Sequence, residues 1–234
     1  MGDVAAYISG HAGLFLQRTI EHLQISALAL AVALLVGLPL ALWLGHAGRG
    51  GFLAVNSSNI GRALPTLALL ALLLPVFGLT DRTTIVALAA LAVPPIVTNA
   101  YTGIRGVDRD VVEAARGMGM RGAQVLARVE LPLAAPIVIA GVRTSAVQVV
   151  ATATLGAVIA GGGLGRFIVD GFAIGDTPQI VAGAIAVAVL SILTEVGLGA
   201  VERLVTPTGT TLAQRGPRAR RTAAEPAPGA RAPI

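Results

Sequence analysis

The chain has 234 residues, of which 55% are hydrophobic and 12% are charged, and its mean hydropathy is +0.80. Soluble domains carry about a quarter charged residues, so this composition predicts a protein of the lipid bilayer. There is no cysteine, which excludes disulfides, thiolate zinc sites and cysteine nucleophiles. The net charge of +5 arises from 17 arginines with no lysine, which excludes a Walker A loop and a Schiff-base enzyme. Aromatic residues make up 3%, too few for base stacking, so we expect no nucleic-acid partner.

Five apolar runs follow one another along the chain and predict an all-α integral membrane protein with five transmembrane helices. They cover residues 23–44, 53–77, 84–101, 133–160 and 180–201. At about 1.5 Å per residue, each run is long enough to cross roughly 30 Å of hydrocarbon. Prolines inside such runs are tolerated where neighbouring helices or water satisfy the freed carbonyl groups.

The segments on either side of this transmembrane domain, 23–205, differ from it in composition. Residues 1–22 lack the pattern of a cleaved signal peptide, and we expect an extracytoplasmic segment with a small amphipathic surface helix over 14–22. Residues 206–234 are rich in proline, alanine, glycine and arginine, which predicts a disordered cytoplasmic tail. The three histidines are scattered without metal-ligand spacing, so we expect neither a metal nor a catalytic site.

The distribution of arginines predicts the orientation of the chain in the membrane. If the loop 103–132 is cytoplasmic, twelve arginines lie inside and three outside, which are Arg18, Arg82 and Arg166. Cytoplasmic loops retain positive charge. The pattern therefore predicts an amino terminus outside and a carboxyl terminus inside.

The loop 103–132 carries the most informative pattern. Asp110 followed by Glu113 is typical of a capping box at a helix start. An apolar stripe on one face of that helix is formed by Val112, Ala115 and Met118. Gly117 and Gly119 should break the helix, and a second short helix over 121–129 should end before Leu131 and Pro132. Two short helices joined at glycine predict a docking element beside the membrane.

This loop resembles the EAA loop of ABC-importer permeases of the type I, MetI-like superfamily. The pattern is Glu-Ala-Ala, three residues, Gly, nine residues, a β-branched aliphatic residue, one residue and Leu-Pro. Every position is filled here, by Glu113, Ala114, Ala115, Gly119, Val129, Leu131 and Pro132. The stretches LPTLALLALLLPVFG, PPIVTNAYTGIRGVD, EAARGMGM and ATATLGAVIAGGGLG resemble permeases for glycine betaine, choline and carnitine, except that Ala151 replaces a glycine of that family.

The resemblance implies a transport subunit rather than an enzyme. In that family the EAA loop is a coupling helix that sits in a cleft of a cytoplasmic ABC ATPase subunit, which binds the ATP, so no cofactor is expected in this chain. The implied partners are ATPase subunits, a second permease subunit (a copy or a paralogue), an extracytoplasmic substrate-binding protein and membrane lipid. The binding protein would dock near residues 166–177.

Polar residues inside the apolar runs are the candidates for a translocation pathway. Thr144, Gln148 and Thr152 recur at every fourth position and share one helix face. Such a face meets either a water-filled path or neighbouring helices, with which it would form hydrogen bonds, and both interpretations stay open. Asn99 and Thr66 lie next to prolines and are weaker candidates of the same kind.

Two further features favour structural interpretations. Arg143 and Glu195 lie in apolar runs, and we expect them to pair with one another or to extend to the membrane surface. The glycine run 161–165 has no following lysine, and we expect a flexible turn there rather than a phosphate loop.

Three alternative functions are weighed against an osmoprotectant ABC permease. An ABC permease for an amino acid such as methionine would use the same loop. A secondary transporter or channel would need carboxylates within its spans, and only Glu195 is present there. An intramembrane serine protease would need a serine and a histidine at matching depth, which the runs do not offer.

Overall fold

The structure is a computed structural model, and it describes residues 2–52, 56, 65–159 and 161–205. The described residues form helices and connecting turns without a β-strand, which confirms the all-α class. Four helices are long and apolar enough to cross a membrane: Ala12–Ala47, Asp81–Arg105, Gly122–Ile159 and Thr177–Leu204. Of the predicted run 53–77, the structure describes a shorter apolar helix, α4 (Thr66–Phe77), whereas 53–55 and 57–64 lie outside the described residues. A fifth span is therefore not confirmed.

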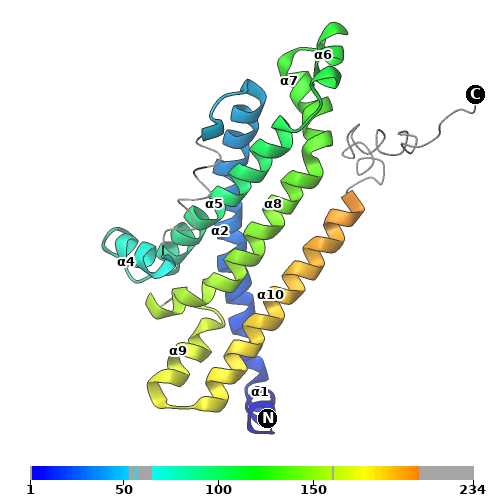
Figure 1. Cartoon of the computed structure of the whole chain (residues 1–234). Helices are drawn as coiled ribbons and strands as arrows, with labels where there is room; N and C mark the ends of the chain where they lie inside the picture. Colours follow the sequence, from blue (N-terminus) through cyan, green and yellow to red (C-terminus); the bar gives the residue numbers. More distant parts are fainter. Residues whose placement is uncertain (1, 53–55, 57–64, 160, 206–234) are drawn as a thin grey trace, which may run out of the picture.

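Three long helices form the centre of the bundle (Figure 1). These helices are α2 (Ala12–Ala47), α5 (Asp81–Arg105) and α8 (Leu131–Thr152). α10 (Thr177–Val205) packs on α8 and on α9 (Gly165–Ile174), while α4 lies against α5. α1 (Gly2–Gly10) and α9 lie at one end of the bundle, and α6 (Arg109–Gly117) and α7 (Gly122–Val125) lie at the other (Figure 1). We call the end with α1 and α9 the hairpin end, and the end with α6 and α7 the loop end.

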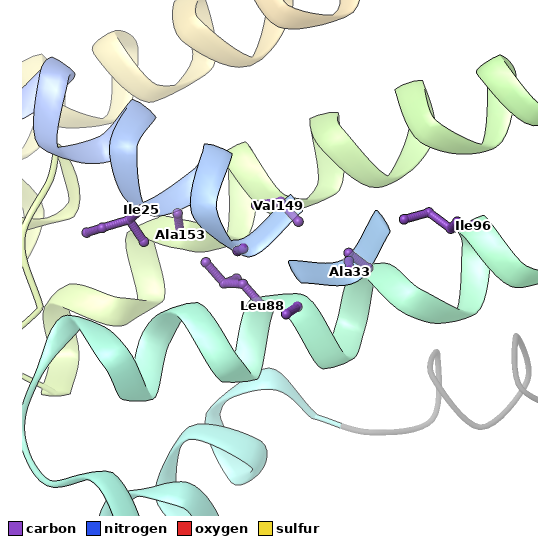
Figure 2. Packing of buried hydrophobic residues seen from close by; sticks show 9 residues of the cluster. Ile25, Ala33, Leu88, Ile96, Val149 and Ala153 are labelled. Carbon is purple, nitrogen blue, oxygen red and sulfur yellow. The ribbon is translucent and has the colours of Figure 1, made fainter. Parts of the chain in front are cut away.

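Small residues let the three central helices approach closely (Figure 2). The buried cluster contains Ala29 and Ala33 of α2, Ala89 and Ala92 of α5, and Ala153, with larger side chains filling the gaps between them. Without a hydrophobic driving force between helices in lipid, close van der Waals contact of this kind is a main source of association.

The amino-terminal prediction was wrong in one respect. Residues 14–22 belong to α2, which begins at Ala12 and continues to Ala47 without interruption, so they do not form a separate surface helix. His22 is buried inside the bundle. Its Nε2 lies 2.8 Å from the carbonyl oxygen of Val150, and its Nδ1 accepts a hydrogen bond from the N–H of Leu164. These tertiary contacts explain why the helix continues through this segment.

The second loop helix does not end before Leu131 and Pro132, contrary to the prediction. α7 passes into a π-helical turn, Leu126–Glu130, which continues directly into α8. Proline lacks an N–H, and its ring crowds the carbonyl four residues earlier in a regular α-helix. The wider π turn, which pairs residues five apart, accommodates Pro132 without a break.

Candidate functional site

The loop helix α6 is a short helix that stands out from the loop end of the bundle (Figure 1). Asp108 caps it, because its carboxylate accepts a hydrogen bond of 2.9 Å from the N–H of Asp110. The predicted capping box of Asp110 and Glu113 is therefore wrong, since the cap lies two residues earlier. Glu113 is exposed and forms no hydrogen bond or ion pair within the described part of the chain.

The two faces of α6 differ in burial. Ala115 is only 2% exposed and is the buried contact of this helix with the bundle. Val111 and Met118 are exposed, with Met118 at 78%, so they project away from the bundle. The predicted stripe is wrong at Met118, because the helix ends at Gly117 and Met118 leaves its face. Ala114 is also exposed, so the outer face of α6 presents Val111 and Ala114, whereas the exposed Glu113 lies on the side that faces the ends of α2 and α5.

Gly119 forms the turn after α6. Its φ is +84°, a left-handed conformation that only glycine adopts at little cost. Its N–H donates a hydrogen bond to the carbonyl of Arg116. A Cβ placed on Gly119 would meet no atom of the other described residues within 4 Å, and the same holds for Gly117. The turn is therefore open to a close backbone approach by a partner.

The remaining motif residues lie at the base of the loop rather than on its outer face. Val129 belongs to the π turn, and Leu131 and Pro132 begin α8. Their position joins the loop to the span-length helix Gly122–Ile159 without an interruption.

A hydrogen-bonded pair that no sequence pattern predicts lies under the loop. His46, at the end of α2, places its Nδ1 2.6 Å from Oε2 of Glu130. Glu130 is only 5% exposed. The two residues are separated by 84 positions, and an isolated histidine and an isolated glutamate carry no spacing pattern that would have paired them.

The threonines of the polar stripe on α8 form hydrogen bonds within their own helix. Thr144 and Thr152 donate their hydroxyl protons to carbonyls of their own helix, those of Ala140 and Gln148, at 2.9 Å and 2.6 Å. The Gln148 amide forms no hydrogen bond with any described residue. One interpretation of the stripe predicted hydrogen bonds from these three residues to neighbouring helices, and none is present among the described residues.

Asn99 lies next to this stripe and takes part in helix packing. Its amide donates a hydrogen bond of 2.8 Å to the carbonyl of Pro95 within α5, and its side chain packs against Gly141, three residues before Thr144. The hydrogen bond that does join the two helices was missed: Ser145 donates to the carbonyl of Ala92 at 3.1 Å. Thr66 is the first residue of α4 and is half-buried.

The predicted pairing of Arg143 with Glu195 is confirmed, and it has a second partner. Arg143 donates hydrogen bonds to Glu195 and to Glu202, the latter at 2.7 Å. Gly199 lies between the two glutamates on α10, and a Cβ there would come within 3.2 Å of the guanidinium. The contact fastens α10 to α8 in the half of the bundle nearer the loop end.

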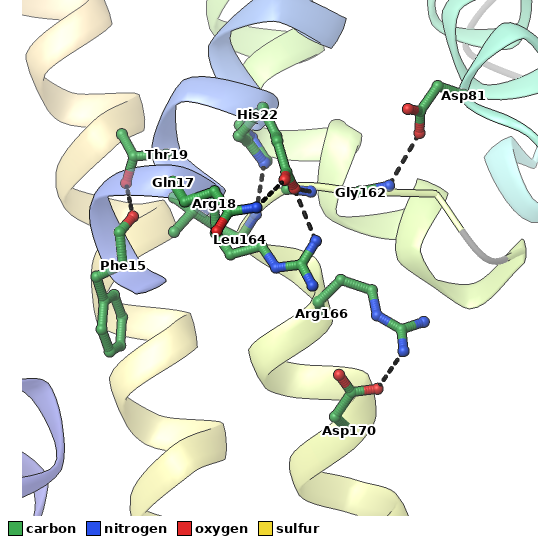
Figure 3. A network of polar contacts seen from close by, with 12 residues as sticks. Phe15, Gln17, Arg18, Thr19, His22, Asp81, Gly162, Leu164, Arg166 and Asp170 are labelled. Atoms are coloured by element: carbon green, nitrogen blue, oxygen red, sulfur yellow. Dashed lines mark hydrogen bonds and ion pairs between the residues drawn. The ribbon is translucent and has the colours of Figure 1, made fainter. Parts of the chain in front are cut away.

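The glycine run at the hairpin end is a packed turn, so the prediction of a flexible one was wrong (Figure 3). The N–H groups of Gly162 and Gly163 donate to the carboxylates of Asp81 and Glu21, and the next N–H bonds to His22. Ala160 lies outside the described residues. Two helices, α2 and α5, are therefore joined to the turn by side-chain to backbone hydrogen bonds that composition alone does not reveal.

An aromatic cluster covers the same end. Phe15 of α2 and Phe167 of α9 stack with ring centroids 4.0 Å apart, and Tyr7 of α1 meets both edge-on. Burial, and then the carboxylates of Asp176 and Asp170, raise the pKa of the Tyr7 phenol above its usual value. Phe167 lies in the segment where the resemblance places a binding protein.

The span-length helices, the exposed loop helix and its glycine turn define a membrane transport component. The family model of the binding-protein-dependent transport system inner membrane component matches residues 33–207, and the chain belongs to this family. It is 39% identical over 209 residues to the choline transport system permease protein OpuBB of Bacillus subtilis (strain 168), covering 89% of this chain and 96% of that protein. It is 38% identical, with the same coverage, to the glycine betaine/carnitine/choline transport system permease protein OpuCB of that organism.

Solved structures support the fold. A chain of the inward-facing MetNI methionine ABC transporter superposes with a TM-score of 0.73 at 22% identity, over 85% of this chain and 99% of that chain. A chain of an amino acid ABC transporter with histidines gives a TM-score of 0.68 at 23% identity. This superposition covers 85% of the present chain and 97% of the transporter chain. At this identity the likeness concerns the fold of the helix bundle.

Proposed function

We propose that the chain is the permease subunit of an ATP-driven importer for a small quaternary amine such as choline, glycine betaine or carnitine. The proposal rests on the identity to choline and glycine betaine permeases along almost the whole chain. The observation that carries it is the loop helix α6, whose Glu113 and Ala114 are both exposed at one end of the bundle.

The mechanism assigned to this chain is mechanical. A cytoplasmic ATPase subunit binds and hydrolyses ATP, and its closure moves α6. The continuous helix from α7 through the π turn into α8 carries that movement to Gln148 and its neighbours, beside α5. The chain itself holds no cofactor and performs no covalent chemistry.

The assembly requires three kinds of partner. A second permease subunit completes the path, an ABC ATPase contacts the loop end, and an extracytoplasmic substrate-binding protein delivers the substrate at the hairpin end. The gathering of arginines at the loop end supports a cytoplasmic location for it; they include Arg105, Arg109, Arg116, Arg121 and Arg128. The amino terminus is then outside and the carboxyl terminus inside.

Reconstituted transport tests the proposal. The chain is placed in proteoliposomes with its ATPase and binding protein, and uptake of radiolabelled choline, glycine betaine, carnitine and methionine is measured with ATP or with ADP inside. We expect ATP-dependent uptake of a quaternary amine and none of methionine. Methionine uptake would overturn the substrate class, and uptake without ATP would overturn the importer mechanism.

A further inference from the structure

A polar cavity of about 310 Å³ lies directly behind α6, where α2 and α5 end. The end of α2 contributes His46 and the backbone of its neighbours, and α5 contributes Arg105. α6 contributes Arg109, Glu113 and Arg116, and Glu130 of the π turn closes the cavity. The cavity therefore separates the loop helix from the ends of two span-length helices.

Positive charge is in excess in this cavity. Within the described part of the chain, Arg105, Arg109 and Arg116 form no ion pair, whereas Glu130 is held by His46. Three arginines line the cavity against two glutamates, Glu113 and Glu130. A guanidinium presents its donors in a planar fork that fits two oxygens of a phosphate, so unpaired arginines around one cavity indicate an anion of this geometry.

The cavity lies at the depth of lipid headgroups. Trp43 is exposed on α2, three residues before His46 and close to the end of that span-length helix. Tryptophan gathers at the boundary between hydrocarbon and water, which places the cavity just outside the hydrocarbon. Basic pockets between the ends of membrane helices are recurrent sites for phosphate headgroups.

We propose that this cavity binds a phosphate-bearing anion through Arg105 of α5 and Arg109 and Arg116 of α6. α6 rests on the bundle through one buried side chain, Ala115, so an anion bridging the arginines of both helices adds a second attachment. Bound anion thereby steadies the loop helix. The phosphate group is the same in an anionic lipid headgroup and in free phosphate, and either source supplies the chemistry.

Thermal unfolding of the permease in complex with its ATPase tests the site. Inorganic phosphate is titrated at constant ionic strength against the wild type, R109Q/R116Q and the control R121Q/R128Q. The control removes the same charge from exposed arginines of the same loop that do not line the cavity. We expect a phosphate-dependent rise in melting temperature for wild type and control, and a half-saturating concentration at least about tenfold higher for R109Q/R116Q.

Two further arms complete the test. If R109Q/R116Q does not assemble, Arg105→Gln leaves α6 unaltered and should weaken phosphate binding alone. Native mass spectrometry of complexes from membranes with phosphatidylglycerol identifies a lipid source if wild type and control retain one phosphatidylglycerol that the cavity variant loses. Stabilisation by phosphate with no retained lipid identifies a soluble source. The proposal is overturned if the wild type shows neither stabilisation by phosphate nor a retained phosphatidylglycerol. It is also overturned if R121Q/R128Q loses the phosphate response as much as R109Q/R116Q does.

Discussion

A Cβ atom placed on Gly141 would lie 2.5 Å from the Cβ of Asn99, so these two residues set how closely α8 approaches α5. Contacts this short do not occur between real side chains, and Asn99 cannot rotate its own Cβ away. One turn further along, the Ser145 hydroxyl reaches the Ala92 carbonyl across the same interface. α8 is thus held beside α5 by a contact that admits only glycine.

Replacing Gly141 by alanine should destabilise the bundle by about 1–3 kcal/mol, because overpacking forces the two helices apart. Thermal unfolding in detergent measures the effect. Gly197→Ala is the matched control, since a Cβ on Gly197 meets no atom of the structurally described residues within 4 Å and alanine favours the helix. An unchanged melting temperature in Gly141→Ala would show that the contact does not limit the approach of α5 and α8.

Gln148→Leu should leave assembly intact and lower uptake severalfold. The Gln148 amide forms no hydrogen bond with the described residues, so its loss breaks no contact there, whereas a water-filled path loses a polar group. Melting temperature and ATP-driven uptake are measured on the same preparation.

The control for Gln148 is Thr194→Val on α10, whose hydroxyl bonds to its own helix and lies outside the stripe. We expect this control to keep normal uptake. A lowered melting temperature of Gln148→Leu, with unchanged uptake per folded molecule, would assign the stripe to helix packing instead.

Gly119→Ala should cost about 1 kcal/mol, because its positive φ is unfavourable for a residue with a Cβ. Gly117→Ala should be neutral or stabilising, since Gly117 is helical and equally unobstructed. Gly119→Phe should in addition uncouple ATP hydrolysis from uptake, because the ring occupies the open turn that faces the partner. Unchanged coupling in Gly119→Phe would show that the turn does not contact the ATPase.

Orientation is testable because the chain has no cysteine of its own. Ala123→Cys at the loop end and Ala173→Cys at the hairpin end both replace an exposed alanine. In intact cells, a membrane-impermeant maleimide should label only the hairpin-end variant, and both should react after permeabilisation. Labelling of Ala123→Cys from outside would reverse the proposed orientation.

Regular sequence patterns predicted much of this architecture. Apolar runs of sufficient length correspond to four long helices, and the spacing from Glu113 to Pro132 placed the loop helix and its glycine turn correctly. The pairing of Arg143 with Glu195 followed from the cost of an unpaired charge in an apolar run. These features depend on local periodicity or on a strong energetic rule.

Contacts between distant segments could not be predicted in the same way. The pair of His46 and Glu130, and the capture of glycine N–H groups by Asp81 and Glu21, join residues more than 80 positions apart. The helix through Pro132 continues because a π turn absorbs the proline, and no propensity argument distinguishes that from a break. A single sequence does not specify such tertiary pairings.

The most direct test of the central claim is site-specific cross-linking from Met118, the exposed residue that directly follows α6. A photoreactive group is attached to Met118→Cys, and to Ala173→Cys as the control at the opposite end, in the assembled complex. The account predicts that the Met118 probe cross-links to the ATPase subunit, with a yield that changes on ATP binding, and that the Ala173 probe does not. A complex that assembles and hydrolyses ATP without any cross-link from Met118 would contradict the assignment of α6 as the coupling helix.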